Sequence, residues 1–211
     1  MQKTEPRIPA DYDQPDLRGR FGPYGGVYVA DCDGKRVLEY APKSTKEVRT
    51  INLPGCPNGL AIDPSNNLYV GYTVPYSYAS QVEKFRAGAT RGTALLPPKT
   101  VRFIGSVAID RHGNLVVANE GDGAIDVFSR PKQPPSAVIK TGQTLPFRFA
   151  FDHSQNRIYI TSPYLQDARR APPSGPKLAN TVVVLDYPSG NRLSVFRQKG
   201  WIPTGIAIGS P

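Results

Sequence analysis

Residues 57–70 read P-N-G-L-A-I-D-P-S-N-N-L-Y-V, two short apolar runs on either side of a polar turn. Residues 60–62 and 68–70 have the composition of strands. Residues 63–67 supply Asp, Pro, Ser and Asn, which set turn dihedral angles or hydrogen-bond to their own backbone. The stretch therefore predicts two strands joined by a tight turn.

The same pattern recurs along the chain. Residues 107–117 (VAIDRHGNLVV) and 149–160 (FAFDHSQNRIYI) repeat it, residues 203–209 (PTGIAIG) give its first half, and residues 26–31 (GVYVAD) give its second half. Equivalent alanines lie 47, 42 and 57 residues apart: Ala61, Ala108, Ala150 and Ala207. Periods of this size are typical of four-stranded propeller blades.

This repeat resembles that of the NHL-repeat and senescence-marker/gluconolactonase-like β-propellers, over about residues 24–211. The resemblance implies an all-β fold of antiparallel four-stranded blades. Counting repeats gives about four blades, with residues 206–208 as the strand that closes the first blade and removes two open sheet edges. Residues 1–23, polar and rich in proline, are expected to be an extended arm. Relatives of this kind usually have six blades, so a shortened propeller that pairs with a second copy is the alternative.

Composition bounds the function classes. The 211 residues suffice for one domain, and 22 prolines with 20 glycines indicate many turns. The net charge of +9 allows a polyanionic partner, but basic and aromatic residues are not interleaved along a strand, so nucleic acid is not an expected partner. No run approaches the roughly 20 apolar residues of a membrane helix. Residues 1–7 lack the apolar core of a signal peptide. The compartment stays open, with an extracytoplasmic origin as one option that the resemblance implies.

The two cysteines, Cys32 and Cys56, do not have the spacing of a metal site. We expect free or buried thiols, with a single disulfide as the alternative.

In a propeller, the loops that enter the innermost strands and the loops after the second strands lie at one end. Loops on a rigid scaffold carry function, so this end is the expected binding site. The candidate ligand-binding residues there are Asp31, Asn58, Tyr76, Tyr78, Asn119, Glu120, Arg148, Arg169 and Arg170. The last two lie in a long insertion, residues 163–180, which either covers the channel as a lid facing an anionic partner or is a surface loop.

The lactonase branch of the resemblance implies a divalent metal held by Asn, Asp or Glu just before several innermost strands. The matching positions here are Asn58, Gly105, Phe147 and Thr204. Only the first is a good oxygen ligand, and a hard cation needs several. We therefore predict no metal and no cofactor, with Ca²⁺ or another divalent cation as the alternative.

No catalytic residue is assigned. The chain has no nucleophile elbow or phosphate-binding loop, and its two histidines, His112 and His153, lie in turns at the opposite end. The sequence favours a non-enzymatic binding scaffold, monomeric or dimeric, for a protein, glycan or small molecule. The alternative is a lactonase- or hydrolase-like propeller with a degenerate metal site, and a third hypothesis, based on charge alone, is a polyanion-binding module.

Overall fold

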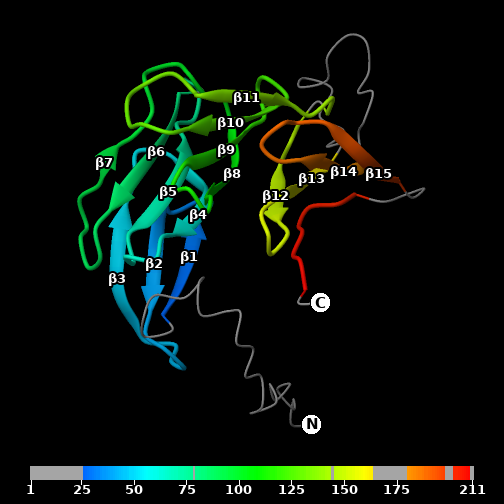
Figure 1. The fold of residues 1–211 in the computed structure, drawn as a ribbon. Helices are drawn as coiled ribbons and strands as arrows, with labels where there is room; N and C mark the ends of the chain where they lie inside the picture. The colour runs from blue at the N-terminus through cyan, green and yellow to red at the C-terminus, as the bar shows by residue number, and fades with distance from the viewer. Residues whose placement is uncertain (1–25, 78, 144, 164–179, 198–201, 210–211) are drawn as a thin grey trace, which may run out of the picture.

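The computed structural model describes residues 26–77, 79–143, 145–163, 180–197 and 202–209. These residues form fifteen strands in four antiparallel sheets, and none of them is helical (Figure 1). The predicted all-β architecture is confirmed. Among the described residues there is accordingly no helix with the length and hydropathy needed to cross a membrane. The expected arm, residues 1–23, lies outside the described residues.

Each sheet is one blade, and its strands are adjacent in chain order. Blade 1 consists of β1 (Val27–Asp31), β2 (Arg36–Tyr40) and β3 (Glu47–Asn52). Blade 2 consists of β4 (Cys56–Ile62), β5 (Leu68–Thr73), β6 (Ser80–Phe85) and β7 (Thr93–Ala94). Blade 3 consists of β8 (Ile104–Ile109), β9 (Leu115–Asn119), β10 (Ala124–Phe128) and β11 (Ala137–Lys140). Blade 4 consists of β12 (Arg148–Phe151), β13 (Arg157–Ser162), β14 (Thr181–Asp186) and β15 (Arg192–Arg197).

The turn of the repeat is built in the same way in three blades. Each begins with an aspartate whose carboxylate accepts backbone N–H bonds: Oδ1 of Asp63 from Asn67 at 2.9 Å, Oδ1 of Asp110 from Asn114 at 2.8 Å, and Oδ1 of Asp152 from Asn156 at 2.9 Å. The fourth residue of each turn has a positive φ: Asn66 (62°), Gly113 (79°) and Gln155 (53°). The recurring aspartates are therefore turn caps, as expected from their short carboxylates.

Apolar cores lie between successive blades. Val37 and Ile51 of blade 1 pack with Val70 of blade 2. On β9, Val117 packs towards blade 2, whereas its neighbour Val116 packs towards blade 4. Because both faces of blades 2 and 3 are covered, β5, β9 and β10 are buried at every position.

The predicted closing strand does not form. Residues 202–209 contain no strand, and among the described strands β1 pairs with β2 alone. The segment instead lies against Tyr159, Val182 and Phe196 of blade 4, and Figure 1 shows it apart from β1. After the outer strand of each blade the chain enters the inner position of the next, and after β15 that position lies beyond blade 4. The first sheet thus has three strands where the sequence predicted four.

Candidate functional site

One end of the blades collects the starts of the inner strands and the ends of the second strands. Register shows this directly: Cys56 lies opposite Thr73, Ile104 opposite Asn119, and Arg148 opposite Thr161. Of the candidate residues that the sequence assigned to this end, strand pairing places Asn119 and Arg148 there.

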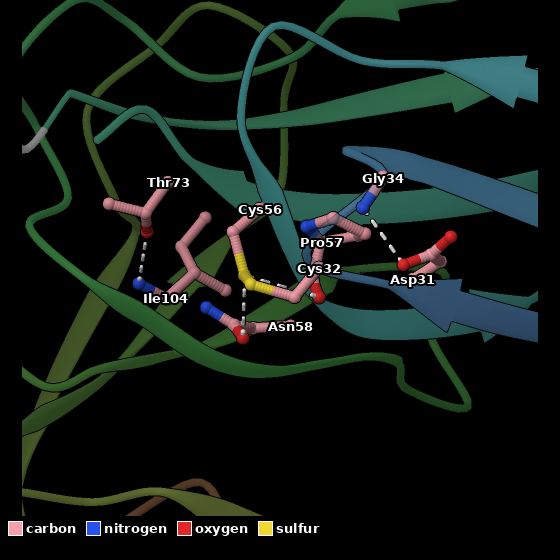
Figure 2. Close-up of a disulfide and its surroundings, with 8 residues drawn as sticks. All are labelled: Asp31, Cys32, Gly34, Cys56, Pro57, Asn58, Thr73 and Ile104. Atoms are coloured by element: carbon pink, nitrogen blue, oxygen red, sulfur yellow. Dashed lines mark hydrogen bonds between the residues drawn. A yellow bond between two sulfur atoms is a disulfide. The ribbon is translucent and has the colours of Figure 1, made fainter.

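Cys32 and Cys56 form a disulfide at this end, with Cα atoms 4.3 Å apart (Figure 2). The expectation of free or buried thiols is therefore wrong. The turn after β1 and the first residue of β4 face each other across the blade interface, a proximity that a separation of 24 residues does not reveal. Oδ1 of Asn58 lies 3.6 Å from Sγ of Cys56. This is a van der Waals contact, because a disulfide sulfur has no hydrogen to donate.

The entry to β8 is held by two buried hydroxyls of blade 2. Thr73 Oγ1 and Ser80 Oγ are 2.9 Å apart, and they accept backbone N–H bonds from Ile104 at 3.2 Å and Phe103 at 3.0 Å. This fixes the base of the β5–β6 loop. Tyr76, near the tip of that loop, is 97% exposed, and Tyr78 lies outside the described residues.

Asn119 is buried inside blade 3. Its Nδ2 donates to Asp126 at 2.8 Å and to Asp122 at 3.0 Å, and its Oδ1 accepts from the backbone N–H of Arg102. Burial raises the pKa of the Asp126 carboxyl. The hydrogen bond from Asn119 lowers this pKa and so partly offsets the effect of burial. These contacts engage the side chain of Asn119 within the sheet and stabilise the β9–β10 turn.

Arg148 and Glu120 come together where β12 approaches β8. The Arg148 guanidinium lies 4.0 Å from the ring centroid of Phe147, a cation–π geometry, and Nη1 donates to the carbonyl of Gly105. Burial lowers the pKa of Arg148, and the nearby Glu120 carboxylate acts in the opposite direction. A Cβ at Gly105 would lie 2.9 Å from Oε1 of Glu120 and would clash with the carbonyl of Phe147. Glycine is required here for close approach.

Asp31, at the end of β1, is a turn cap. Its carboxylate accepts from the backbone N–H of Gly34 at 2.9 Å and from Nε of Arg36 at 2.8 Å. These hydrogen bonds, with that from Gly34 first, lower the pKa of Asp31.

The structure thus brings Glu120 and Arg148 together and places Asn58 beside the disulfide at the same end. Arg169 and Arg170 lie outside the described residues. Gly105 and Phe147, which sequence reasoning considered only as failed metal ligands, are the partners of Arg148. The signal for this contact in the sequence was Gly105, a glycine within the inner strand β8. No group of three or more His, Cys, Asp or Glu is arranged for a metal within the described part of the chain.

Comparison with known proteins identifies the fold. No family model and no curated protein matches the sequence. Hydrazine synthase of Kuenenia stuttgartiensis matches the structure with a TM-score of 0.62 at 17% identity, over 90% of this chain and 52% of that chain. A chain of the nidogen/laminin complex matches with a TM-score of 0.63 at 17% identity, over 82% and 59%. The dihydro-heme d1 dehydrogenase NirN in complex with DHE matches with a TM-score of 0.57 at 17% identity, over 88% and 37%.

This fold is a β-propeller. Identities this low show the architecture alone, and they do not extend to the narrower NHL-repeat or gluconolactonase-like superfamily. This propeller chain spans between 37 and 59% of the length of these three chains.

Proposed function

We propose that this propeller is a non-enzymatic scaffold that binds a protein, glycan or small molecule at the end where its inner strands begin. The placement of Arg148 carries the proposal. Its guanidinium is half-buried, stacks on Phe147, and lies near the Glu120 carboxylate. A partly desolvated charge in a fixed position between blades is typical of a binding site.

The chemistry of this position suits a polar ligand. A guanidinium is a planar fork that binds a carboxylate through two donors, and a carboxylate such as that of Glu120 accepts hydrogen bonds from hydroxyl or amide groups. Tyr76, exposed at the same end, offers a ring on which a sugar or an aromatic group can stack. Glycans that contain sugar acids and peptides with a carboxylate combine these features.

The fold is compatible with several functions. The nidogen/laminin structure is a protein complex, whereas the hydrazine synthase and NirN structures are enzymes. Function must therefore be argued from the site. A lactonase-type metal centre needs several converging oxygen ligands, and Asn58 is the one good ligand among the positions that the family pattern specifies.

A glycan array that includes sugar acids, together with a carboxylate-bearing peptide panel, tests the proposal. We expect the parent to bind a subset of these probes and Arg148→Gln to lose that binding while keeping a similar melting temperature. Arg130→Gln, at an exposed position of blade 3, is the matched control and should bind like the parent. A stoichiometric divalent metal in the purified protein together with lactone hydrolysis would reject the scaffold in favour of the enzyme.

We also propose that the protein works in an oxidising, extracytoplasmic compartment. The Cys32–Cys56 disulfide supports this, because disulfides persist in such compartments and are rare in the cytosol. Trapping thiols with maleimide in cells that produce the protein should leave both cysteines unmodified. Complete labelling of both would exclude this localisation.

A further inference from the structure

Among the described residues, blade 1 has no innermost strand, whereas each of the other blades has one. Cys32, just after β1, is bonded to Cys56 at the start of β4, so β1 ends where the inner strands begin. The second strands β5, β9 and β13 also end there. β1 therefore occupies the second-strand position, and no described strand pairs with its channel-side edge.

The segment 203–209 has the sequence of an inner strand but belongs to none of the described sheets. Its sequence is the first half of the repeat, and it follows the outer strand β15 as β8 follows β7 and β12 follows β11. Burial alternates along it: Ile206 and Ile208 are half-buried, whereas Ala207 and the glycines beside these residues are exposed. It lies against Tyr159, Val182 and Phe196 on the outer face of blade 4, and the carbonyl of Gly209 is 3.2 Å from Nε2 of His153.

We propose that residues 203–209 of one copy form the innermost strand of blade 1 in a second copy, and that two copies exchange these strands reciprocally. The register follows from β4 and β5, where Leu60, Ala61 and Ile62 lie opposite Val70, Tyr69 and Leu68. Transferred through the repeat, Ile206 lies opposite Val29, Ala207 opposite Tyr28, and Ile208 opposite Val27. The open edge of β1 then gains the backbone hydrogen bonds that an edge strand lacks.

The strand exchange also covers two exposed apolar faces, one on blade 1 and one on blade 4. On blade 1, Val27 and Val29 are each 41% exposed, and the register places Val29 on the same face as Leu38. On blade 4, Phe196 is 51% exposed on the face that it shares with Val182. Every other blade interface in the molecule is an apolar core. Packing blade 4 of one copy on blade 1 of the next continues that interface.

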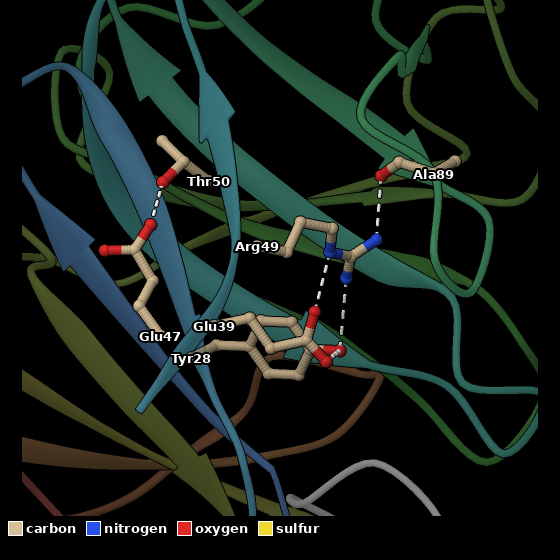
Figure 3. A network of polar contacts seen from close by, with 6 residues as sticks. All are labelled: Tyr28, Glu39, Glu47, Arg49, Thr50 and Ala89. Atoms are coloured by element: carbon tan, nitrogen blue, oxygen red, sulfur yellow. Dashed lines mark hydrogen bonds and ion pairs between the residues drawn. The ribbon is translucent and has the colours of Figure 1, made fainter. Parts of the chain in front are cut away.

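Side-chain contacts and the disulfide fix the position of β1 in blade 1. Arg49 of β3 has a side chain that is 9% exposed, and its Nε pairs with Oε2 of Glu39 at 2.6 Å (Figure 3). Its Nη1 donates to the carbonyl of Ala89 in blade 2 at 2.8 Å, and its Nη2 donates to the hydroxyl of Tyr28 on β1 at 3.3 Å. With the disulfide, these contacts fix β1 relative to β4. A preorganised edge reduces the entropy lost on binding.

A second copy is the occupant that these observations favour. The chain carries both the blade without a described inner strand and a segment with the sequence of that strand, and in one copy this segment lies against blade 4 and not against β1.

Light scattering on the 211-residue chain is the first test. We expect a dimer of twice the 23.0 kDa chain mass. Ile206→Asp, which places a charge on the half-buried face of the exchanged strand, should convert the dimer to a monomer, and Ile206→Val should leave it dimeric. A monomeric parent or an open-ended polymer would overturn the exchange.

Cross-linking between two different chains tests the register and does not depend on the folding of Ile206→Asp. A chain carrying Val29→Cys is mixed with one carrying Ile206→Cys, and the mixture is oxidised. We expect a disulfide-linked product of twice the chain mass, mapped by mass spectrometry to positions 29 and 206. Val29→Cys mixed with Ser65→Cys, at an exposed turn, should give no such product. As a further test, Val29→Cys and Ile206→Cys are placed together in one chain. If that chain forms only an intramolecular disulfide between positions 29 and 206, it closes its own first blade and the proposal is wrong.

Discussion

The hydroxyl of Tyr187 donates a 2.8 Å hydrogen bond to Oδ2 of Asp110, and both residues are 5% exposed. Asp110 caps the β8–β9 turn of blade 3, whereas Tyr187 follows β14 of blade 4. One carboxylate therefore terminates a repeat turn and also joins two successive blades.

Removing this hydroxyl should destabilise the protein. In Tyr187→Phe the buried Asp110 carboxylate loses a donor, which costs about 1–3 kcal/mol for a hydrogen bond to a charged group. Chemical denaturation should show a lower midpoint with an unchanged slope. Tyr76→Phe is the control, because that side chain is almost fully exposed, and it should melt like the parent. Equal stability of the two variants would show that the hydrogen bond contributes nothing net.

Stability should fall in acid. Burial raises the pKa of Asp110, but the hydrogen bonds from Asn114 and Tyr187 outweigh it, so the pKa is lowered overall. A carboxyl with a lowered folded pKa contributes stability above its unfolded pKa of about 3.9, and that contribution is lost as the pH falls through the folded value. Melting temperatures between pH 6 and pH 2 should therefore decline more steeply in the parent than in Asp110→Asn. Parallel pH profiles would contradict this assignment.

Loss of the disulfide should weaken the attachment of blade 1 to blade 2. Cys32 and Cys56 are 24 residues apart in the chain, and the chain-entropy model gives about 3.5 kcal/mol for a loop of this size. The double variant Cys32→Ala/Cys56→Ala should show this loss in denaturant, and reductant should lower the parent to the same midpoint. Hydrogen exchange should increase first in β1 and β2. A parent whose stability does not respond to reductant would contradict the prediction.

Gly105→Ala should disturb the Arg148 site. An added methyl group would clash with the carbonyl of Phe147 and approach Glu120 to 2.9 Å. Overpacking of this kind costs about 1–3 kcal/mol. Thermal denaturation measures the cost, and Ser65→Ala, at an exposed turn, is the control. A melting temperature equal to that of the control would mean that β8 and β12 can move apart freely.

The repeat alone determined the class of fold and much of the local structure. An apolar triplet, an aspartate-capped turn and a second apolar run predict strand pairs wherever they occur, because turn hydrogen bonds and the alternation of strand side chains are local properties. The turn aspartates and the end of the blades at which Glu120 and Arg148 lie therefore followed from residue order.

Contacts between blades were decided only by the tertiary structure. The Cys32–Cys56 disulfide, the stacking of Arg148 on Phe147 and the bond from Tyr187 to Asp110 join separate repeats, and their distances depend on how blades pack. The position of residues 203–209 shows the same limit. Their sequence predicts an inner strand, but whether such a segment joins a sheet depends on how the blades pack, and residues 202–209 join none of the described sheets.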